Sequence, residues 1–223
     1  MAELLPCIEL ETGAAPSAAV IVLHGLGADG NDFVPIVEEL PLPDSLAIRF
    51  VFPHAPARPV TINNGFVMRA WYDVVGNDFT RGADLDGVRA SRSLVEALIE
   101  REKARGVPAS RLVLAGFSQG GAIALYTGLR HSERLAGVVA LSGYLIDGES
   151  LAHEASAANR DVPIFMAQGT ADPVVQFAWA DTSRAALQSA GYTVEWHTYA
   201  MGHSVVWEEV EALGAFLTRA LQP

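Results

Sequence analysis

The chain has 223 residues, of which 50% are apolar and 18% are charged, and its net charge is −11. The high apolar content excludes intrinsic disorder as the main state, and a chain of this length can bury a large core. The acidic balance disfavours anionic membrane surfaces and argues against nucleic-acid partners, whose phosphates require Lys and Arg.

The N-terminal segment, Met1 to Leu10, carries Glu3 and Glu9 and has no basic region, so it does not resemble a signal peptide. Its Cys7 is the only cysteine of the chain, which excludes an intrachain disulfide and a Cys-rich metal site. Apolar runs such as Ala18 to Leu23 are far shorter than the ~18 residues of a membrane span. We expect a cytoplasmic protein with no stable membrane insertion.

Short apolar runs that end at Gly, Pro or polar residues recur along the chain. Near-continuous runs of this kind are typical of strands that are buried on both faces of a parallel sheet. The predicted strands are Val20 to Leu23, Ile48 to Phe52, Leu112 to Ala115, Leu135 to Leu141, Val162 to Ala167 and Thr193 to Tyr199.

Helical patterns lie between these runs. Asp84 is a candidate N-cap for a helix that ends at Gly106, with Pro108 just beyond. A second helix is predicted from Gln119 to Arg130, and a third carries Val206, Val210, Leu213, Phe216 and Leu217 on one side. Strands that alternate with helices predict an α/β fold, and we expect one domain over residues 1–223.

The segment from His54 to Gly82 has no clean period and is rich in Pro, Gly and large apolar side chains. One interpretation is a buried irregular crossover, and the other is a flap that lines an acyl pocket. Its apolar cluster suggests Phe66, Met68 and Trp71 as substrate-binding residues; the cluster also holds Val67, Tyr72 and Phe79.

The segment Gly116-Phe117-Ser118-Gln119-Gly120 matches the G-x-S-x-G pattern of a nucleophile elbow. It follows a predicted strand and precedes the small-residue start of a predicted helix, which is the context that this motif requires. The glycines permit a strained turn and a close approach of strand and helix. Ser118 is therefore the candidate nucleophile, held at a helix N-terminus that favours negative charge.

A serine hydroxyl needs a base, and His203 is the candidate because it lies between the last strand and the last helix. Of the other histidines, His24 is expected to support a loop and His197 to be structural, whereas His54 could also lie near the site; the remaining two are His131 and His153.

Asp172 follows the penultimate predicted strand and would orient the base. The chain order Ser, Asp, His is that of the α/β-hydrolases. The alternative role for Asp172 is a helix N-cap before Pro173.

Two backbone amides are the candidate oxyanion donors. One belongs to Gln119, the residue after the nucleophile, and the other to Leu26 in the loop after the first predicted strand. Glycines in that loop, Gly25 and Gly27, allow the backbone to approach the substrate closely.

Six motifs together resemble the phospholipase/carboxylesterase family, which includes bacterial carboxylesterases and acyl-protein thioesterases. The motifs are Leu23-His24-Gly25-Leu26-Gly27-Ala28-Asp29, Phe52-Pro53-His54-Ala55-Pro56, Arg69-Ala70-Trp71-Tyr72-Asp73, Gly116-Phe117-Ser118-Gln119-Gly120-Gly121, Leu141-Ser142-Gly143-Tyr144 and Met201-Gly202-His203-Ser204. They span nearly the whole chain in the family's order.

The resemblance implies an α/β-hydrolase fold, with a mostly parallel central sheet flanked by helices and no large cap domain. It implies Ser118, Asp172 and His203 as the triad, and Leu26 and Gln119 as the oxyanion donors. The implied activity is hydrolysis of small to medium acyl carboxylic esters through an acyl-enzyme, without metal or cofactor.

The sequence leaves three other functions open. An acyl-protein thioesterase or a lysophospholipase would use the same triad, and a non-catalytic binding protein could use the same scaffold. A peptidase is disfavoured because nothing marks a peptide groove. The expected partner is a small-molecule ester, and exposed apolar loops could supply a homodimer interface.

Overall fold

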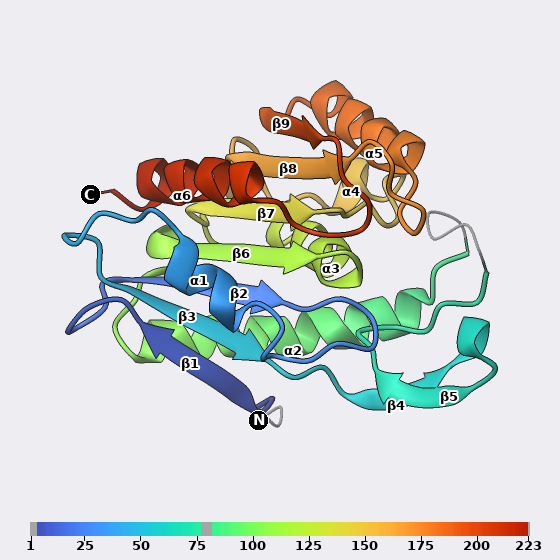
Figure 1. Ribbon diagram of the computed structural model, residues 1–223, viewed down its shortest axis with the longest axis horizontal. Coiled ribbons are helices and arrows are strands. Elements are labelled where there is room, and N and C mark those ends of the chain that lie inside the picture. The colour runs from blue at the N-terminus through green and yellow to red at the C-terminus, as the bar shows by residue number, and fades with distance from the viewer. Residues whose placement is uncertain (1–3, 77–81, 223) are drawn as a thin grey trace.

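A seven-stranded sheet forms the centre of the computed structural model, which describes residues 4–76 and 82–222 (Figure 1). The strand order is β1-β3-β2-β6-β7-β8-β9, and all neighbours are parallel except β1 and β3. The strands are β1 (Cys7–Glu11), β2 (Ala18–Leu23), β3 (Ile48–Pro53), β6 (Leu112–Phe117), β7 (Gly137–Leu141), β8 (Ile164–Gly169) and β9 (Val194–Tyr199).

The six parallel strands confirm the predicted apolar runs to within a few residues. β3, β7 and β8 are buried along their whole length, as expected for strands covered on both faces. β1 was not among the predicted strands, because Glu9 and Glu11 alternate with apolar residues and leave no continuous run. It pairs antiparallel with β3 at the edge of the sheet, where those carboxylates are exposed.

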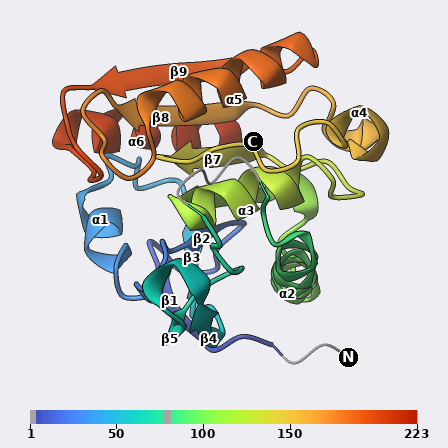
Figure 2. The ribbon, with the colours of Figure 1, turned by 90° about the vertical axis from the view of Figure 1, so that its right-hand side faces the viewer.

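Helices cover both faces of the sheet. α1 and α6 lie on one face, whereas α2 and α3 lie on the other, as the two views show (Figures 1 and 2). Leu187 of α5 belongs to the same apolar core as α2 and α3. The helices are α1 (Val34–Glu39), α2 (Leu85–Ala104), α3 (Gln119–Gly128), α4 (Leu151–Glu154), α5 (Phe177–Ser189) and α6 (Trp207–Leu221).

The predicted limits of α2 are confirmed by its end groups. The Asp84 carboxylate accepts a hydrogen bond from the Gly87 amide at 2.9 Å, which caps the first turn. After the helix, Gly106 adopts a φ of 96°, the left-handed conformation that glycine enters without a steric penalty.

The irregular segment from His54 contains a two-stranded hairpin of β4 (Ala57–Val60) and β5 (Phe66–Arg69). The hairpin projects at the edge where the parallel strands end (Figure 1). The chain then turns inward, and Ala70, Trp71 and Tyr72 are buried. Residues 77–81, including Phe79, lie outside the described residues.

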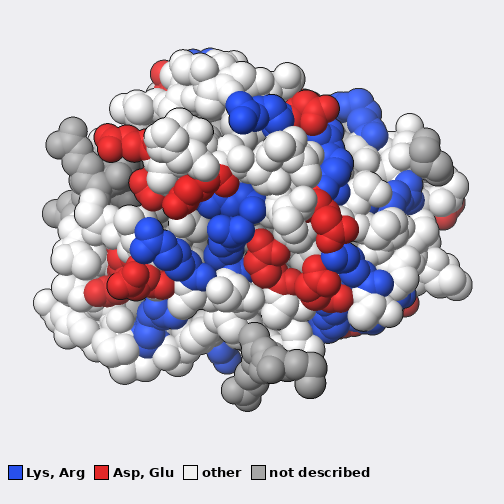
Figure 3. Space-filling view, turned by 180° about the vertical axis from the view of Figure 1, so that it is seen from behind, with Lys and Arg blue, Asp and Glu red and all other residues white. Residues whose placement is uncertain are grey.

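Charged side chains of both signs are interspersed on the face seen from behind (Figure 3). Beneath the surface, the fully buried Glu102 of α2 accepts hydrogen bonds from Arg49 at 2.9 Å, and from Arg101 and Arg105 at 3.0 Å. A buried carboxylate requires such partners, so this network ties the end of α2 to β3.

Candidate active site

Ser118 lies in a sharp turn between β6 and α3. Its backbone has φ 55° and ψ −120°, a conformation that costs a non-glycine residue free energy and is typical of nucleophile elbows. The turn is possible because its flanking glycines have no side chains. A methyl group on Gly120 would lie 2.1 Å from the Leu23 oxygen, and one on Gly116 would lie 2.3 Å from the Gly120 carbonyl carbon.

His203 and Asp172 form a hydrogen-bonded pair in the loops after β9 and β8. Nδ1 of His203 lies 2.7 Å from Oδ2 of Asp172, whose carboxylate is completely buried. Oδ1 of Asp172 accepts hydrogen bonds from the amides of Val174 at 2.8 Å and Val175 at 2.9 Å. Gln168 donates to Oδ2 at 3.1 Å. The carboxylate is therefore fixed in orientation before any substrate binds.

Asp172 does not cap a helix before Pro173, which was its alternative role. The next helix, α5, begins at Phe177, and its N-cap residue is Gln176. Asp172 instead orders the turn over residues 172–175 and presents its other oxygen to the imidazole.

Ser118 and His203 lie at the same edge of the sheet, and Phe117 connects them. The Phe117 ring packs on the His203 imidazole with centroids 4.6 Å apart. Among the described residues, Ser118 Oγ has no hydrogen-bond partner. Hydrogen bonds between nucleophile and base are often long without substrate and shorten in the substrate complex.

The loop after β2 runs directly beside Ser118. A methyl group on Gly25 would lie 3.5 Å from Ser118 Cβ. Within the part of the chain that the structure describes, the amides of Leu26 and Gln119 donate to no other group. Both amides are therefore free to bind an anionic oxygen, as expected for oxyanion donors.

His24 supports this loop, as the sequence predicted. Its Nε2 accepts a hydrogen bond from the Ala55 amide at 3.0 Å, so the ring proton resides on Nδ1, which donates to Gly25 O at 2.7 Å. Burial lowers the pKa of His24 and keeps the ring neutral. His24 thus fixes the start of the loop that carries Leu26 and is unavailable as a base.

The Gln119 side chain makes a contact that sequence reasoning missed. Its Oε1 accepts from the Trp71 amide and its Nε2 donates to the Tyr72 carbonyl, both at 2.8 Å. A glutamine directly after Ser118 was the available signal, but its partners lie 47 or more residues away. We call this pair of bonds the Gln119 clamp. It joins the elbow to the segment that follows the hairpin.

The three expected substrate-binding residues occupy different positions. Phe66 is 68% exposed at the end of the hairpin, and the sulfur of Met68 lies 3.5 Å from the position of a methyl group on Gly27. Trp71 is fully buried, and its Nε1 donates to the His24 carbonyl at 2.9 Å. Met68 thus lies beside the loop after β2, whereas Trp71 supports that loop through a hydrogen bond to His24 and does not face an open site.

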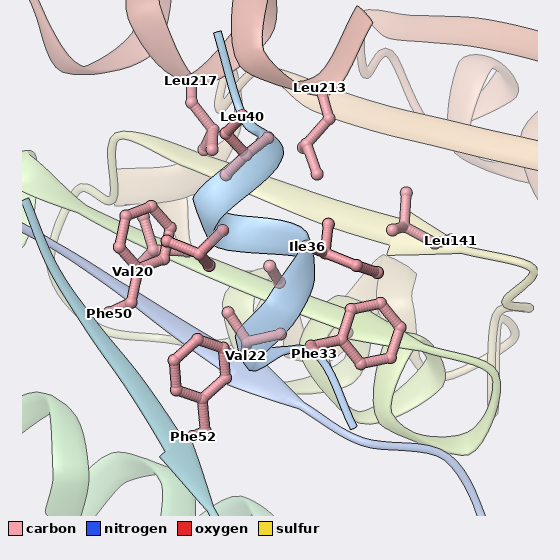
Figure 4. A pocket seen from close by; sticks show the side chains of 13 residues that line it. Val20, Val22, Phe33, Ile36, Leu40, Phe50, Phe52, Leu141, Leu213 and Leu217 are labelled. Atoms are coloured by element: carbon pink, nitrogen blue, oxygen red, sulfur yellow. The ribbon is translucent and has the colours of Figure 1, made fainter. Parts of the chain in front are cut away.

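An apolar cavity of about 30 Å³ lies between α1 and α6 on the sheet face opposite α3 (Figure 4). Leu213 and Leu217 of α6 extend toward α1, where Leu40 lies beside Leu217, while Phe33 and Ile36 lie on the side of Leu141. Phe33 also packs against Phe117, with ring centroids 5.5 Å apart. The cavity has no polar lining and therefore offers nothing to bind a scissile carbonyl.

The described residues contain no cluster of three or more His, Cys, Asp or Glu side chains that could hold a metal ion. Within the same ranges, no helix combines the length and the apolar character needed to cross a bilayer.

The sequence matches the model of the Phospholipase/Carboxylesterase family over residues 7–221. It is 40% identical to acyl-protein thioesterase 1 of Neurospora crassa over 217 residues, which cover 93% of this chain and 89% of the relative. It is 38% identical to acyl-protein thioesterase 1 of Yarrowia lipolytica, over 92% of each chain.

Solved structures show the same fold. Arabidopsis thaliana SOBER1 superposes with a TM-score of 0.86 at 32% identity, covering 92% of this chain and 99% of that one. Zea mays acyl-protein thioesterase 2 superposes with a TM-score of 0.85 at 31% identity, covering 97% and 99%. These similarities agree with the mostly parallel sheet flanked by helices, which is the α/β-hydrolase fold.

Proposed function

Because the chain belongs to the phospholipase/carboxylesterase family of α/β-hydrolases, we propose that it is a serine hydrolase that cleaves carboxylic esters of small to medium acyl groups. Ser118 is the nucleophile, His203 the general base and Asp172 the residue that orients it. The observation that carries the proposal is the 2.7 Å bond between His203 and Asp172, at the edge where Ser118 occupies a strained elbow.

In the acylation step, Ser118 Oγ attacks the ester carbonyl and His203 takes its proton. The carbonyl oxygen becomes an oxyanion, which accepts hydrogen bonds from the amides of Leu26 and Gln119. His203 then donates the proton to the leaving alcohol, so the C–O bond breaks and the acyl group stays on Ser118.

In the deacylation step, His203 removes a proton from water, which attacks the acyl-enzyme carbonyl. The second oxyanion binds the same two amides, and its collapse releases the carboxylic acid and returns the proton to Ser118. Asp172 stabilises the imidazolium that forms in both steps. Every step uses this chain's own residues.

Thioester hydrolysis is the second candidate, because the relatives from Neurospora crassa and Yarrowia lipolytica are named acyl-protein thioesterases. The same triad serves both reactions, since only the leaving atom changes from oxygen to sulfur. Oxygen esters and thioesters of one acid, compared by kcat/KM, separate the two. A preference for the thioester that persists across acyl lengths would favour the thioesterase.

The test of the proposed function is turnover of an activated short-chain ester by the wild type and by Ser118→Ala. The substitution removes one oxygen atom at a residue with 8% exposure, so the fold should be retained. We expect turnover to fall to background in the variant, with an unchanged circular dichroism spectrum. Retained turnover would overturn the assignment of Ser118.

We also propose that the acyl group lies on the hairpin side of Ser118, against Met68 and Phe66. The support is the position of Met68 beside Gly27 and the exposure of Phe66. Met68→Ala and Phe66→Ala should change the dependence of kcat/KM on acyl length. An unchanged chain-length profile in both variants would contradict this placement.

The cytoplasm is the compartment that we propose for the enzyme. The support is the half-buried free thiol of Cys7, which a reducing environment preserves.

A further inference from the structure

Six large apolar side chains of the described residues are strongly exposed. Three of them, Phe66, Val67 and Val75, belong to the hairpin and the segment after it. Two others, Val174 and Trp207, lie two residues after Asp172 and four residues after His203, and they are 42% and 51% exposed. The sixth is Leu4 near the N-terminus. Apart from Leu4, the exposed apolar side chains thus fall into two groups, one in the hairpin and the segment after it, and one in the segments that follow Asp172 and His203.

Val174 is hydrogen-bonded directly to Asp172 of the proposed catalytic pair. Its amide donates to Oδ1 of Asp172 at 2.8 Å, while its side chain extends into solvent. The carboxylate fixes the backbone of this turn and leaves the apolar side chain without a contact that would bury it. The exposed position of Val174 is therefore set by the same residue that orients the base.

Trp207 is the first residue of α6, four positions after His203. The loop from β9 to α6 runs along the edge at which β6, β7 and β8 end (Figure 1). This loop is joined to the Asp172 turn by a hydrogen bond from the Ala171 amide to Met201 O at 3.1 Å. A methyl group on Gly202 would also contact Pro173 at 3.9 Å. Val174 and Trp207 therefore follow Asp172 and His203 in two segments that contact each other.

The chemistry of the triad decides which part of the substrate faces these two side chains. The base that takes the serine proton must hand it to the leaving atom, so the leaving group lies on the imidazole side of the scissile carbonyl. The acyl group extends from the other side of the carbonyl carbon. Apolar side chains beside His203 therefore meet the alcohol or thiol portion of the substrate.

We propose that Trp207 and Val174 form an apolar seat for the leaving group, and that the enzyme selects alcohols or thiols with an aliphatic or aromatic body next to the scissile atom. The inference rests on the proposed serine-hydrolase function and adds the specificity of its leaving-group side. Glu208, the exposed neighbour of Trp207, adds a negative charge that disfavours anionic leaving groups.

The test compares esters of one acid with 1-alkanols of increasing length, with kcat/KM as the measure of acylation. A fully buried methylene is worth roughly a fourfold change, so contact with a partly exposed seat should give about a twofold rise per methylene. Trp207→Ser should flatten this rise, and Trp207→Phe should restore most of it. A series of alkyl thioesters of the same acid shows whether thiols use the same seat.

Deacylation supplies an internal control, because the leaving group has departed by then. The deacylation rate constant from burst kinetics with a p-nitrophenyl ester should be the same in wild type and Trp207→Ser. Leu4→Ser is the matched surface variant, since Leu4 is 47% exposed and lies outside both catalytic loops. It should retain the full dependence on alkanol length.

The possible results separate this inference from the proposed function. If the wild type forms no acyl-enzyme at Ser118, the proposed function fails. If the acyl-enzyme does form, but the dependence on alkanol length is equal in wild type, Trp207→Ser and Val174→Ser, the proposed binding site for the leaving group is wrong. A Trp207→Ser variant that changes the acyl-length profile and leaves the alkanol dependence intact would place Trp207 on the acyl side and also overturn the inference.

Discussion

The Nδ1 atom of His203 lies 2.7 Å from Oδ2 of Asp172, a contact between loops that are 31 residues apart in the chain. The second carboxylate oxygen is held by two backbone amides, so the aspartate is fixed independently of the imidazole. This arrangement keeps a proton on Nδ1 and leaves Nε2 free to act as the base.

Asp172→Asn tests that relationship. The asparagine oxygen can still accept from the two backbone amides, but its NH₂ group would face Nδ1 and favour the wrong tautomer. We expect kcat to fall by about 10⁴-fold, as in serine-protease triads, with the thermal midpoint nearly unchanged. Activity within tenfold of the wild type on an activated ester would contradict the role of Asp172.

The Gln119 clamp predicts a loss of stability that the proposed role of the Gln119 backbone amide as an oxyanion donor would not produce by itself. In Gln119→Leu, the Trp71 amide and the Tyr72 carbonyl both lose their partner, which should cost about 1–3 kcal/mol of unfolding free energy. Urea denaturation measures this loss. Gln119→Glu keeps an acceptor for the Trp71 amide. It should be less destabilised at low pH than at neutral pH, because a protonated carboxyl can also donate to the Tyr72 carbonyl. A Gln119→Leu variant as stable as the wild type would show that the clamp contributes nothing to the unfolding free energy.

The elbow predicts that Gly120 tolerates no side chain. Gly120→Ala would bring a methyl group to 2.1 Å from the Leu23 oxygen, a backbone atom that cannot move without displacing β2. We expect a loss of about 3 kcal/mol or more and a loss of turnover. Gly76→Ala is the matched control, because no atom of the described residues lies within 4 Å of its added methyl. Similar stabilities for the two variants would refute this geometry.

Glu209 predicts a pH-dependent stability. It is fully buried in α6, and burial raises the pKa of its carboxyl from 4.5 to about 8. Between these values the folded protein holds a proton that the unfolded chain has released. The contribution of Glu209 to the unfolding free energy is therefore fully present below pH 4.5. It falls by about 1.4 kcal/mol per pH unit as the pH rises to about 8.

Glu209→Gln removes this titration and keeps the size of the side chain. Its unfolding free energy relative to the wild type should therefore increase steadily between pH 5 and pH 8. Urea unfolding curves at four pH values across that range measure the difference. A difference that does not vary with pH would contradict a raised pKa at Glu209.

The parallel strands and the order of the candidate triad could be predicted from the sequence because each depends on local patterns. Apolar runs mark strands buried on both faces, and parallel strands bring their C-terminal ends, with Ser118, Asp172 and His203, to one edge. The helix cap at Asp84 is local in the same way. No local pattern predicts β1, whose alternating glutamates suit an edge strand with one solvated face.

The position of Trp71 could not be predicted, because its neighbours come from distant segments. An apolar side chain is equally compatible with a residue that lines a substrate pocket and with a residue that is buried in the core. The burial of Trp71 is decided by tertiary contacts, namely a carbonyl of His24 and the amide side chain of Gln119. The hairpin could not be predicted for a different, local reason: β4 is only four residues long and includes Pro59, which weakens the pattern of a strand.

Covalent labelling of Ser118 tests the central claim most directly. Wild-type protein and Ser118→Ala are incubated with a fluorophosphonate, and the adduct is located by mass spectrometry of the peptides. The account predicts one stoichiometric adduct on Ser118, its loss in Ser118→Ala, and much slower labelling in His203→Ala. Absence of an adduct in folded wild-type protein, or labelling that persists in Ser118→Ala, would contradict it.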